Sequence, residues 1–195
     1  MATAPLFGDP AANAPVWGKY AVLLGSLTAT VPTAGAAFTL NDGTTVTSEW
    51  DPVGALTDDA FDDGAESIES SDHTAAGFGV YATTYRNAKE TRTFTVKEKT
   101  LITLGIRYDT SGVTDTTGTL SGTLKRRDPS EKFKVAFHRQ TKNGSKIERY
   151  ITQNYATIDS ISPAFSNDES TLSVTVTIVP NANDELYDYY LGASS

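Results

Sequence analysis

Few residue types that usually carry enzyme chemistry occur in this chain, and those few are scattered. The chain has no cysteine and two histidines, His73 and His138, which belong to no common motif. The lack of cysteine excludes disulfides and thiolate metal sites, and an isolated histidine is more often solvated or locally hydrogen-bonded than catalytic. No G-x-S-x-G, H-E-x-x-H or P-loop sequence is present. We therefore predict that the chain is not an enzyme and has no cofactor.

The best candidate for metal binding is the segment 51–76, which contains eight acidic residues and no basic one. Its carboxylates include four closely spaced aspartates, Asp58, Asp59, Asp62 and Asp63. The spacing of an EF-hand calcium loop fails, because the third position counted from Asp59 is Phe61 and the twelfth is Ser70. We therefore predict no metal site but a long acidic loop, and a loop of this length is usually functional or disordered.

Charge is unevenly distributed along the chain, whose formal net charge is −8. Residues 1–85 contain 11 acidic residues and one basic residue, residues 86–149 contain 15 basic and 7 acidic residues, and residues 150–195 contain 6 acidic residues and no basic one. Such runs are commonly solvated faces, but they also allow an acidic surface of one copy to meet a basic surface of the next. The overall acidity argues against nucleic-acid binding by affinity, although Lys125-Arg126-Arg127 could contact phosphates.

The clearest element that could position such surfaces is a strand at Thr171–Pro180. Four apolar residues alternate along it, Leu172, Val174, Val176 and Ile178. Between them lie three hydroxyl-bearing residues, Ser173, Thr175 and Thr177. Alternation with a period of two over β-branched residues indicates a strand with one apolar face and one hydroxylated face.

Three further strands are expected just before it, at Lys132–Gln140, Lys146–Gln153 and Tyr155–Ile161. Asn143-Gly144 is a strong hairpin signal between the first two, and Asn154 suits a turn between the second and the third. We therefore predict that the C-terminal third forms an antiparallel four-strand meander, within a block of strands at 119–180.

The rest of the chain also favours β-structure. Strands are expected at Lys19–Val31, Thr44–Trp50, Gly79–Arg86, Glu90–Lys97 and Thr119–Lys125, with a hairpin turn at Asp42-Gly43. Roughly helical spacing of apolar residues predicts one short helix at Glu98–Tyr108 that covers the sheet, followed by a turn-rich connector at 109–118. Residues 1–17 and 181–195 lack alternation and are predicted to be terminal arms. We expect a single domain, 1–195, that is mainly β: an antiparallel β-sandwich or barrel-like subunit with one short flanking α-helix.

Three runs between residues 45 and 180 point to a family when they are taken together. They are Trp50-Asp-Pro-Val-Gly before the acidic segment, the threonine-rich run Arg92-Thr-Phe-Thr-Val-Lys-Glu, and Leu101-Ile-Thr-Leu-Gly-Ile in the expected helix. In this order they resemble the major tail proteins, or tail tube proteins, of long non-contractile-tailed bacteriophages, especially of phages that infect actinobacteria.

The resemblance implies a tail-tube fold in which six subunits form a ring and stacked rings form the conduit for genome ejection. It further implies a location in the virion tail, and it implies as partners other copies of the chain, the tape measure protein and the tail-end proteins. DNA would only pass through the tube without specific binding. The hydroxylated face would then supply the lumen-facing candidates Ser173, Thr175 and Thr177. No membrane partner is expected, because no apolar run approaches the ~20 residues of a membrane span.

Charge segregation suggests how rings would stack. We expect the acidic segment to reach a basic surface of the adjacent ring, in a heterologous and therefore open-ended contact. The candidates on the acidic side are Trp50, Pro52 and Phe61 as apolar anchors, with Asp58, Asp59, Asp62 and Asp63 as charges. The candidates for the basic surface are Lys125, Arg126, Arg127, Lys132 and Lys134.

Two alternatives from other classes stay open. A free-standing β-sandwich that binds carbohydrate or a cell surface would need a cluster of exposed aromatic residues, and the candidates are Tyr187, Tyr189 and Tyr190. A small hydrolase would need a catalytic motif, and the motif search finds none. A binding module stays small in solution, whereas a tube protein forms rings or tubes.

Overall fold

The computed structural model describes residues 17–41, 49–76, 79–97, 100–116, 119–166 and 169–193. Within these residues the protein is mainly β, with twelve strands and one short helix. The first strands are β1 (Trp17–Gly25), β2 (Trp50–Pro52), β3 (Leu56–Phe61), β4 (Ala65–Ala75) and β5 (Gly79–Val96). Helix α2 (Leu101–Arg107) follows, and then come β6 (Tyr108–Thr116), β7 (Thr119–Arg126), β8 (Lys134–Thr141), β9 (Lys146–Thr152), β10 (Tyr155–Ser166), β11 (Glu169–Val179) and β12 (Tyr187–Ala193).

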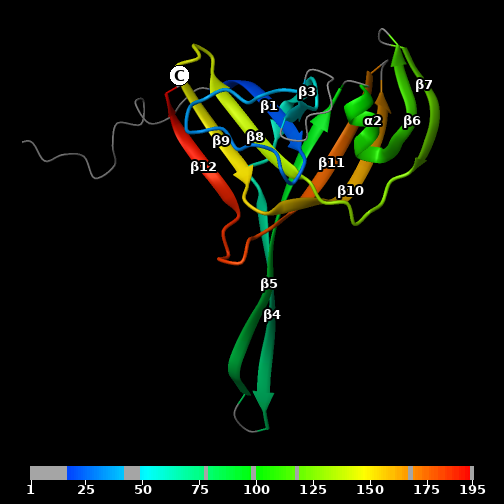
Figure 1. The fold of residues 1–195 in the computed structure, drawn as a ribbon. Helices are drawn as coiled ribbons and strands as arrows, with labels where there is room; N and C mark the ends of the chain where they lie inside the picture. Colours follow the sequence, from blue (N-terminus) through cyan, green and yellow to red (C-terminus); the bar gives the residue numbers. More distant parts are fainter. Residues whose placement is uncertain are drawn as a thin grey trace, which may run out of the picture.

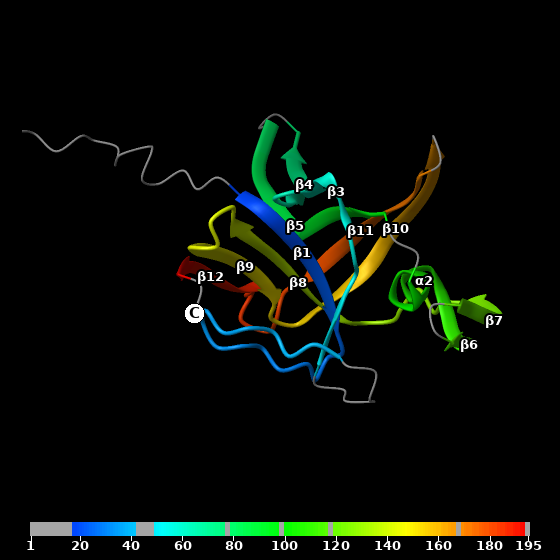
Figure 2. The ribbon, with the colours of Figure 1, turned by 90° about the horizontal axis from the view of Figure 1, so that it is seen from above.

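The strands form two antiparallel sheets and a separate hairpin (Figures 1 and 2). Sheet A has the strand order β12-β9-β8-β1-β2, and sheet B has the order β10-β11-β5-β3, with β4 also paired to β5. Strands β6 and β7 pair only with each other among the described residues, beside helix α2. The antiparallel, mainly β class with one short helix is thereby confirmed.

The two sheets pack face to face around one main core. Most of its buried side chains come from β1 and β8 of sheet A and from β5 and β11 of sheet B; these are Val22, Val135, Phe137, Phe94, Val96, Val174, Val176 and Ile178. Alternating side chains from two inner faces are how a β-sandwich builds its core. The predicted apolar face of Thr171–Pro180 therefore faces this core, although Leu172 is only partly buried.

The predicted four-strand meander is wrong, because its four strands form two hairpins in different sheets. Strands β8 and β9 pair in sheet A, whereas β10 and β11 pair in sheet B. The chain crosses between the sheets at Asn154, whose side-chain amide donates a hydrogen bond to the carbonyl of Pro180 at 2.8 Å. Alternation predicts which side chains face a core, but in a sandwich both sheets face the same core, so alternation cannot assign a strand to one of them.

The predicted helix is confirmed in a shorter form, at Leu101–Arg107. It begins with a capping box, in which the Thr100 hydroxyl accepts from the Thr103 amide and the Thr103 hydroxyl accepts from the Thr100 amide, at 3.2 and 2.8 Å. At its other end the Arg127 guanidinium donates to the carbonyls of Gly105 and Ile106. These bonds satisfy carbonyls that the end of a helix leaves without partners.

Three segments expected to be irregular are strands instead. The acidic segment 51–76 contains β3 and β4, the connector 109–118 contains β6, and the C-terminal arm 181–195 contains β12. Most described side chains of β4 and β6 are exposed, so these strands need no alternating apolar pattern. The N-terminal arm before Trp17 and the Asp42-Gly43 turn lie outside the described residues, whereas the Asn143-Gly144 turn joins β8 to β9 with a positive φ of 74° at Gly144.

Candidate assembly surfaces

The most prominent feature of the molecule is a hairpin that projects from the sandwich (Figure 1). Strand β5 has 18 residues, but it pairs with β11 only between Glu90 and Val96. Its first part, from Gly79 to Lys89, pairs with β4 alone. The 11 residues of β4 correspond to a length of about 35 Å. A two-stranded ribbon is marginally stable by itself, so a projecting hairpin of this length is expected to gain support from a partner.

The root of the hairpin is fixed to sheet A by a buried ion–aromatic cluster. Arg92 is 3% exposed and pairs with Glu90 at 3.0 Å. Its guanidinium lies 4.3 Å from the ring centre of Tyr150, 4.8 Å from Tyr187 and 5.1 Å from Phe137. The Tyr187 hydroxyl donates to Glu90 at 2.7 Å, and burial together with this bond raises the pKa of Tyr187. Because these contacts join β5 to β8, β9 and β12, they set the direction in which the hairpin leaves the body.

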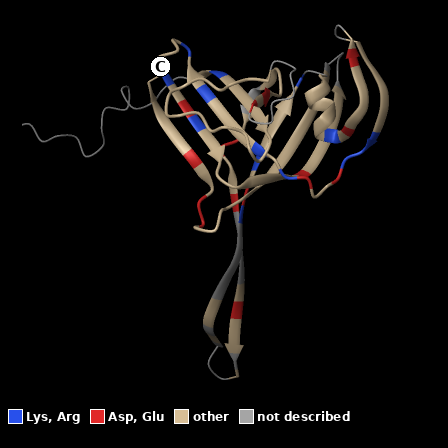
Figure 3. Cartoon of the chain, in the orientation of Figure 1, with Lys and Arg blue, Asp and Glu red and all other residues tan. Residues whose placement is uncertain are grey.

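Sheet B has an outer face made of hydroxyl groups, which we call the hydroxyl face. It consists of three residues from each of three neighbouring strands: Thr91, Thr93 and Thr95 of β5, Ser173, Thr175 and Thr177 of β11, and Thr157, Ser160 and Ser162 of β10. The hydroxyls of Thr93 and Thr175 lie 3.0 Å apart across the strands. None of the nine is charged, and β10 and β11 contain few of the charges coloured in Figure 3. The sequence predicted the three residues of β11, and the strand pairing adds the other six.

The outer face of sheet A, in contrast, is covered by the segment 26–41 (Figure 2). Trp50 is 0% exposed, its indole donates to the carbonyl of Thr30 at 2.8 Å, and the ring of Phe38 packs on it at 5.3 Å. Arg149 also holds this segment through a bond to the carbonyl of Ala36. The prediction that Trp50 anchors a neighbouring ring is therefore wrong, because its side chain is used within the subunit.

The other acidic-side candidates are divided between internal and exposed positions. Phe61 lies between the rings of Tyr20 and Phe137, at 5.8 and 5.3 Å, so its partly buried side chain also packs within the subunit. Asp62 accepts from the amides of Gly64 and Thr93. Asp63 pairs with Arg139 at 3.0 Å, Pro52 is exposed, and the side chains of Asp58 and Asp59 lie outside the described part of the structure.

The predicted basic surface is likewise partly used inside the subunit. Arg127 binds the end of helix α2 and pairs with Glu131 at 2.9 Å. Lys132 lies over the ring of Tyr155 at 4.2 Å. Lys125 and Arg126 are exposed on β7, and Lys134 is half-buried on β8. Arg126 is therefore better placed than Arg127 to meet another molecule.

His138 is held neutral beside a cation. The Arg149 guanidinium donates to its Nδ1 at 3.1 Å, and burial together with the Arg149 charge lowers the pKa of His138 to about 4. The folded state therefore binds fewer protons than the unfolded state between about pH 4 and pH 6.5, and stability rises with pH across this window.

We expect the urea midpoint of the wild type to fall as pH decreases from 7.0 to 4.5, and to fall less in His138→Asn. The asparagine oxygen can still accept from Arg149 but does not titrate. Urea unfolding of both proteins at the two pH values measures the decrease in each midpoint. Comparing the two decreases cancels the effect of the carboxylates, which titrate in both proteins. An equal decrease in both proteins would show that His138 does not contribute to the pH dependence of stability.

No group of three or more His, Cys, Asp or Glu side chains among the described residues could hold a metal ion. No helix in the described ranges is both long and apolar enough to cross a membrane. No protein-family model matches the chain, and no curated protein matches it.

Proposed function

We propose that this chain is a structural subunit that assembles with copies of itself into stacked rings, which form the tail tube of a long-tailed bacteriophage. The projecting β4–β5 hairpin is the observation that carries the proposal. The contacts at its root fix the direction in which it projects. Beyond the root, its two strands pair only with each other among the described residues. A directed projection that meets a different surface of the next copy is a heterologous contact, which repeats without limit.

The hydroxyl face supports the role of a conduit. A basic lining would bind the phosphates of DNA through release of counterions, whereas a neutral polar lining has no such attraction. We therefore place the hydroxyl face at the lumen, with Thr93 and Thr175 at its centre. The alternative binding module is less well supported, because the hydroxyl face has no aromatic residue. Of its three candidates, Tyr187 is committed to the hairpin root and Tyr190 is partly buried, so only Tyr189 is largely exposed.

Size-exclusion chromatography followed by negative-stain electron microscopy tests the proposal directly. We expect purified wild-type protein to give rings or tubes about 10 nm across, the width of six domains of this size around a ring. Protein that stays monomeric at every salt and protein concentration would contradict a tube-forming function.

A charge added to the hydroxyl face tests the lumen assignment separately. Tubes of Thr93→Lys/Thr175→Lys should retain added short DNA, because each ring would present a ring of cations at the lumen. Co-sedimentation of labelled DNA with tubes measures retention. The control is Thr114→Lys/Thr123→Lys on the β6–β7 hairpin. Equal retention by both variants, or by neither, would show that the hydroxyl face does not line the lumen.

A further inference from the structure

The two sheets of the sandwich do not cover each other completely, and the less covered part of sheet A carries large exposed side chains around an internal ion pair. Three large side chains are exposed there, Tyr20 at 40%, Tyr189 at 54% and Leu191 at 50%. Alternation along β1 and β12 places them on the core-facing side of the sheet, in line with the core residues Val22 and Tyr187. We call this surface the sheet A overhang. It continues the core face. Phe61 of β3 reaches the ring of Tyr20 at 5.8 Å, whereas Tyr189 and Leu191 at the β12 end stay about half exposed.

The polar groups inside the sheet A overhang already have partners. Strand register puts Tyr20 beside Arg139, Arg139 beside Glu148, and Glu148 beside Leu191. Arg139 and Glu148 form an ion pair, and Glu148 also accepts a hydrogen bond from the Tyr189 hydroxyl at 3.0 Å. These contacts hold the pKa of Glu148 below its usual value. A partner that covers this surface would therefore bury aromatic and aliphatic area without leaving a charge unpaired.

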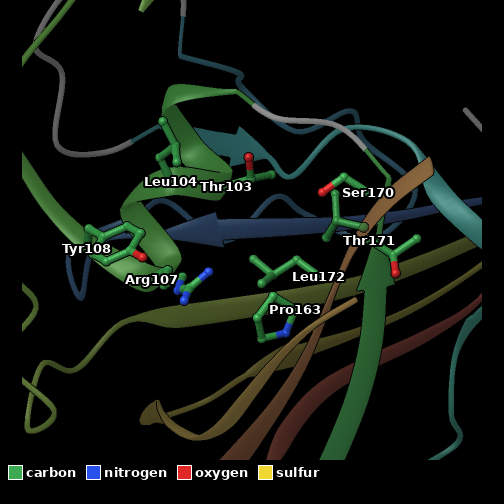
Figure 4. A pocket seen from close by; sticks show the side chains of 9 residues that line it. Thr103, Leu104, Arg107, Tyr108, Pro163, Ser170, Thr171 and Leu172 are labelled. Carbon is green, nitrogen blue, oxygen red and sulfur yellow. The ribbon is translucent and has the colours of Figure 1, made fainter. Parts of the chain in front are cut away.

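Sheet B has an overhang of its own. Strand β11 pairs with β5 only from Leu172 onward, so the end of the β10–β11 hairpin extends past β5. Phe165 lies on this extension and is 76% exposed. Alternation places it on the same side of β10 as Pro163, which lines a pocket together with Leu172 and with Leu104 of helix α2 (Figure 4). The pocket measures about 90 Å³, well below the ~300 Å³ of the smallest usual ligand sites. The pocket is large enough for one side chain.

We propose that the sheet A overhang of one copy packs face to face on the sheet B overhang of a neighbouring copy, so that the sandwich core continues from subunit to subunit. Both surfaces are core-facing sides of the same sandwich, and each lacks the sheet that would cover it. In the joint, Phe165 packs on the ring of Tyr189, and Leu191 enters the pocket beside helix α2. Aromatic pairs of this kind contribute beyond the area that they bury.

The positions of the overhangs explain why the occupant is a second copy. Strand β12 lies at one side of the sandwich, and the β10–β11 hairpin lies toward the other side, next to helix α2 and the β6–β7 hairpin, in both views (Figures 1 and 2). One chain therefore cannot close the joint by itself, whereas each copy can offer one overhang to each of two neighbours. Such a heterologous contact closes into a ring when the rotation permits. The inference rests on the proposed function, because it describes the lateral contact within a ring.

Crosslinking gives a direct test, because the natural chain has no cysteine. We expect assembled Phe165→Cys/Leu191→Cys protein, treated with a flexible bismaleimide, to give a ladder of covalent multimers on a denaturing gel. Each single variant should remain monomeric, as should the control pair Leu124→Cys/Leu191→Cys. A double variant that assembles but gives no ladder would overturn the proposal. A wild type that never assembles would instead overturn the proposed function.

A second test measures the strength of the joint. Phe165→Asp should raise the protein concentration needed for assembly by about tenfold or more, because it removes a buried aromatic group and desolvates a charge. Leu124→Asp, at a residue that is 43% exposed on β7, should leave it unchanged. Thermal unfolding of both variants should match the wild type. Assembly of folded Phe165→Asp protein at the wild-type concentration would contradict the proposal.

Discussion

Removal of the projecting part of the β4–β5 hairpin is expected to leave a folded subunit that forms no tubes. Ser67 and Lys89 are paired across the hairpin, so an Asn-Gly turn can replace residues 68–88 and close the shortened strands. The residues removed lie beyond the part of β5 that pairs with β11, and no residue of the main core is among them. The loss should therefore fall on stacking, with assembly reduced to single rings or monomers.

Electron microscopy and the thermal unfolding midpoint should be measured on the same preparation. A matched control shortens the β6–β7 hairpin, where Asn-Gly replaces residues 114–121 between Val113 and its partner Gly122. We expect the control to keep its tubes. Normal tubes from the variant without the β4–β5 projection would show that this hairpin is not the stacking element.

Loss of the cation at the hairpin root should have the largest effect on stability. Arg92→Met keeps most of the apolar volume but leaves the Glu90 carboxylate without its ion pair, at a site where both side chains are mostly buried. Breaking a buried pair in this way costs about 3–5 kcal/mol. For a chain of this length each kcal/mol corresponds to a shift of about 2–4 °C, so we expect the unfolding midpoint to fall by roughly 6–20 °C.

Two further variants separate the contribution of the Arg92–Glu90 ion pair from that of the contacts between Arg92 and the aromatic rings. Arg92→Met/Glu90→Gln should recover part of the lost stability, because no charge then remains unpaired. Arg92→Lys keeps the charge but loses the planar group that lies among three aromatic rings, and should be intermediate. The control is Arg126→Met, at an exposed residue of β7, which should change the midpoint little. If Arg92→Met unfolds at the same temperature as the wild type, the ion–aromatic cluster does not stabilise the root of the β4–β5 hairpin.

Local patterns in the sequence determined the elements whose side chains face a core on one side. The alternation of Val174, Val176 and Ile178 predicted a strand with a buried face, and all three are fully buried. The Asn143-Gly144 turn was predictable because glycine accepts the positive φ found at Gly144. The helix could be predicted from the spacing of its apolar residues. Each of these patterns involves only a few neighbouring residues, so it can be recognised without knowing the contacts with distant parts of the chain.

Tertiary structure alone decided how the hairpins combine into sheets and which residues stay exposed. The described side chains of β4 are exposed on both faces, so the sequence there shows no period of two and looks like a loop. Trp50 looked available for a partner until the segment 26–41 covered it. The hydroxyl face and the two overhangs depend on the pairing of β5, β10 and β11, and on how far each sheet extends beyond the other. The pairing of β5 with β11 joins strands that are distant in sequence, and no local periodicity encodes it.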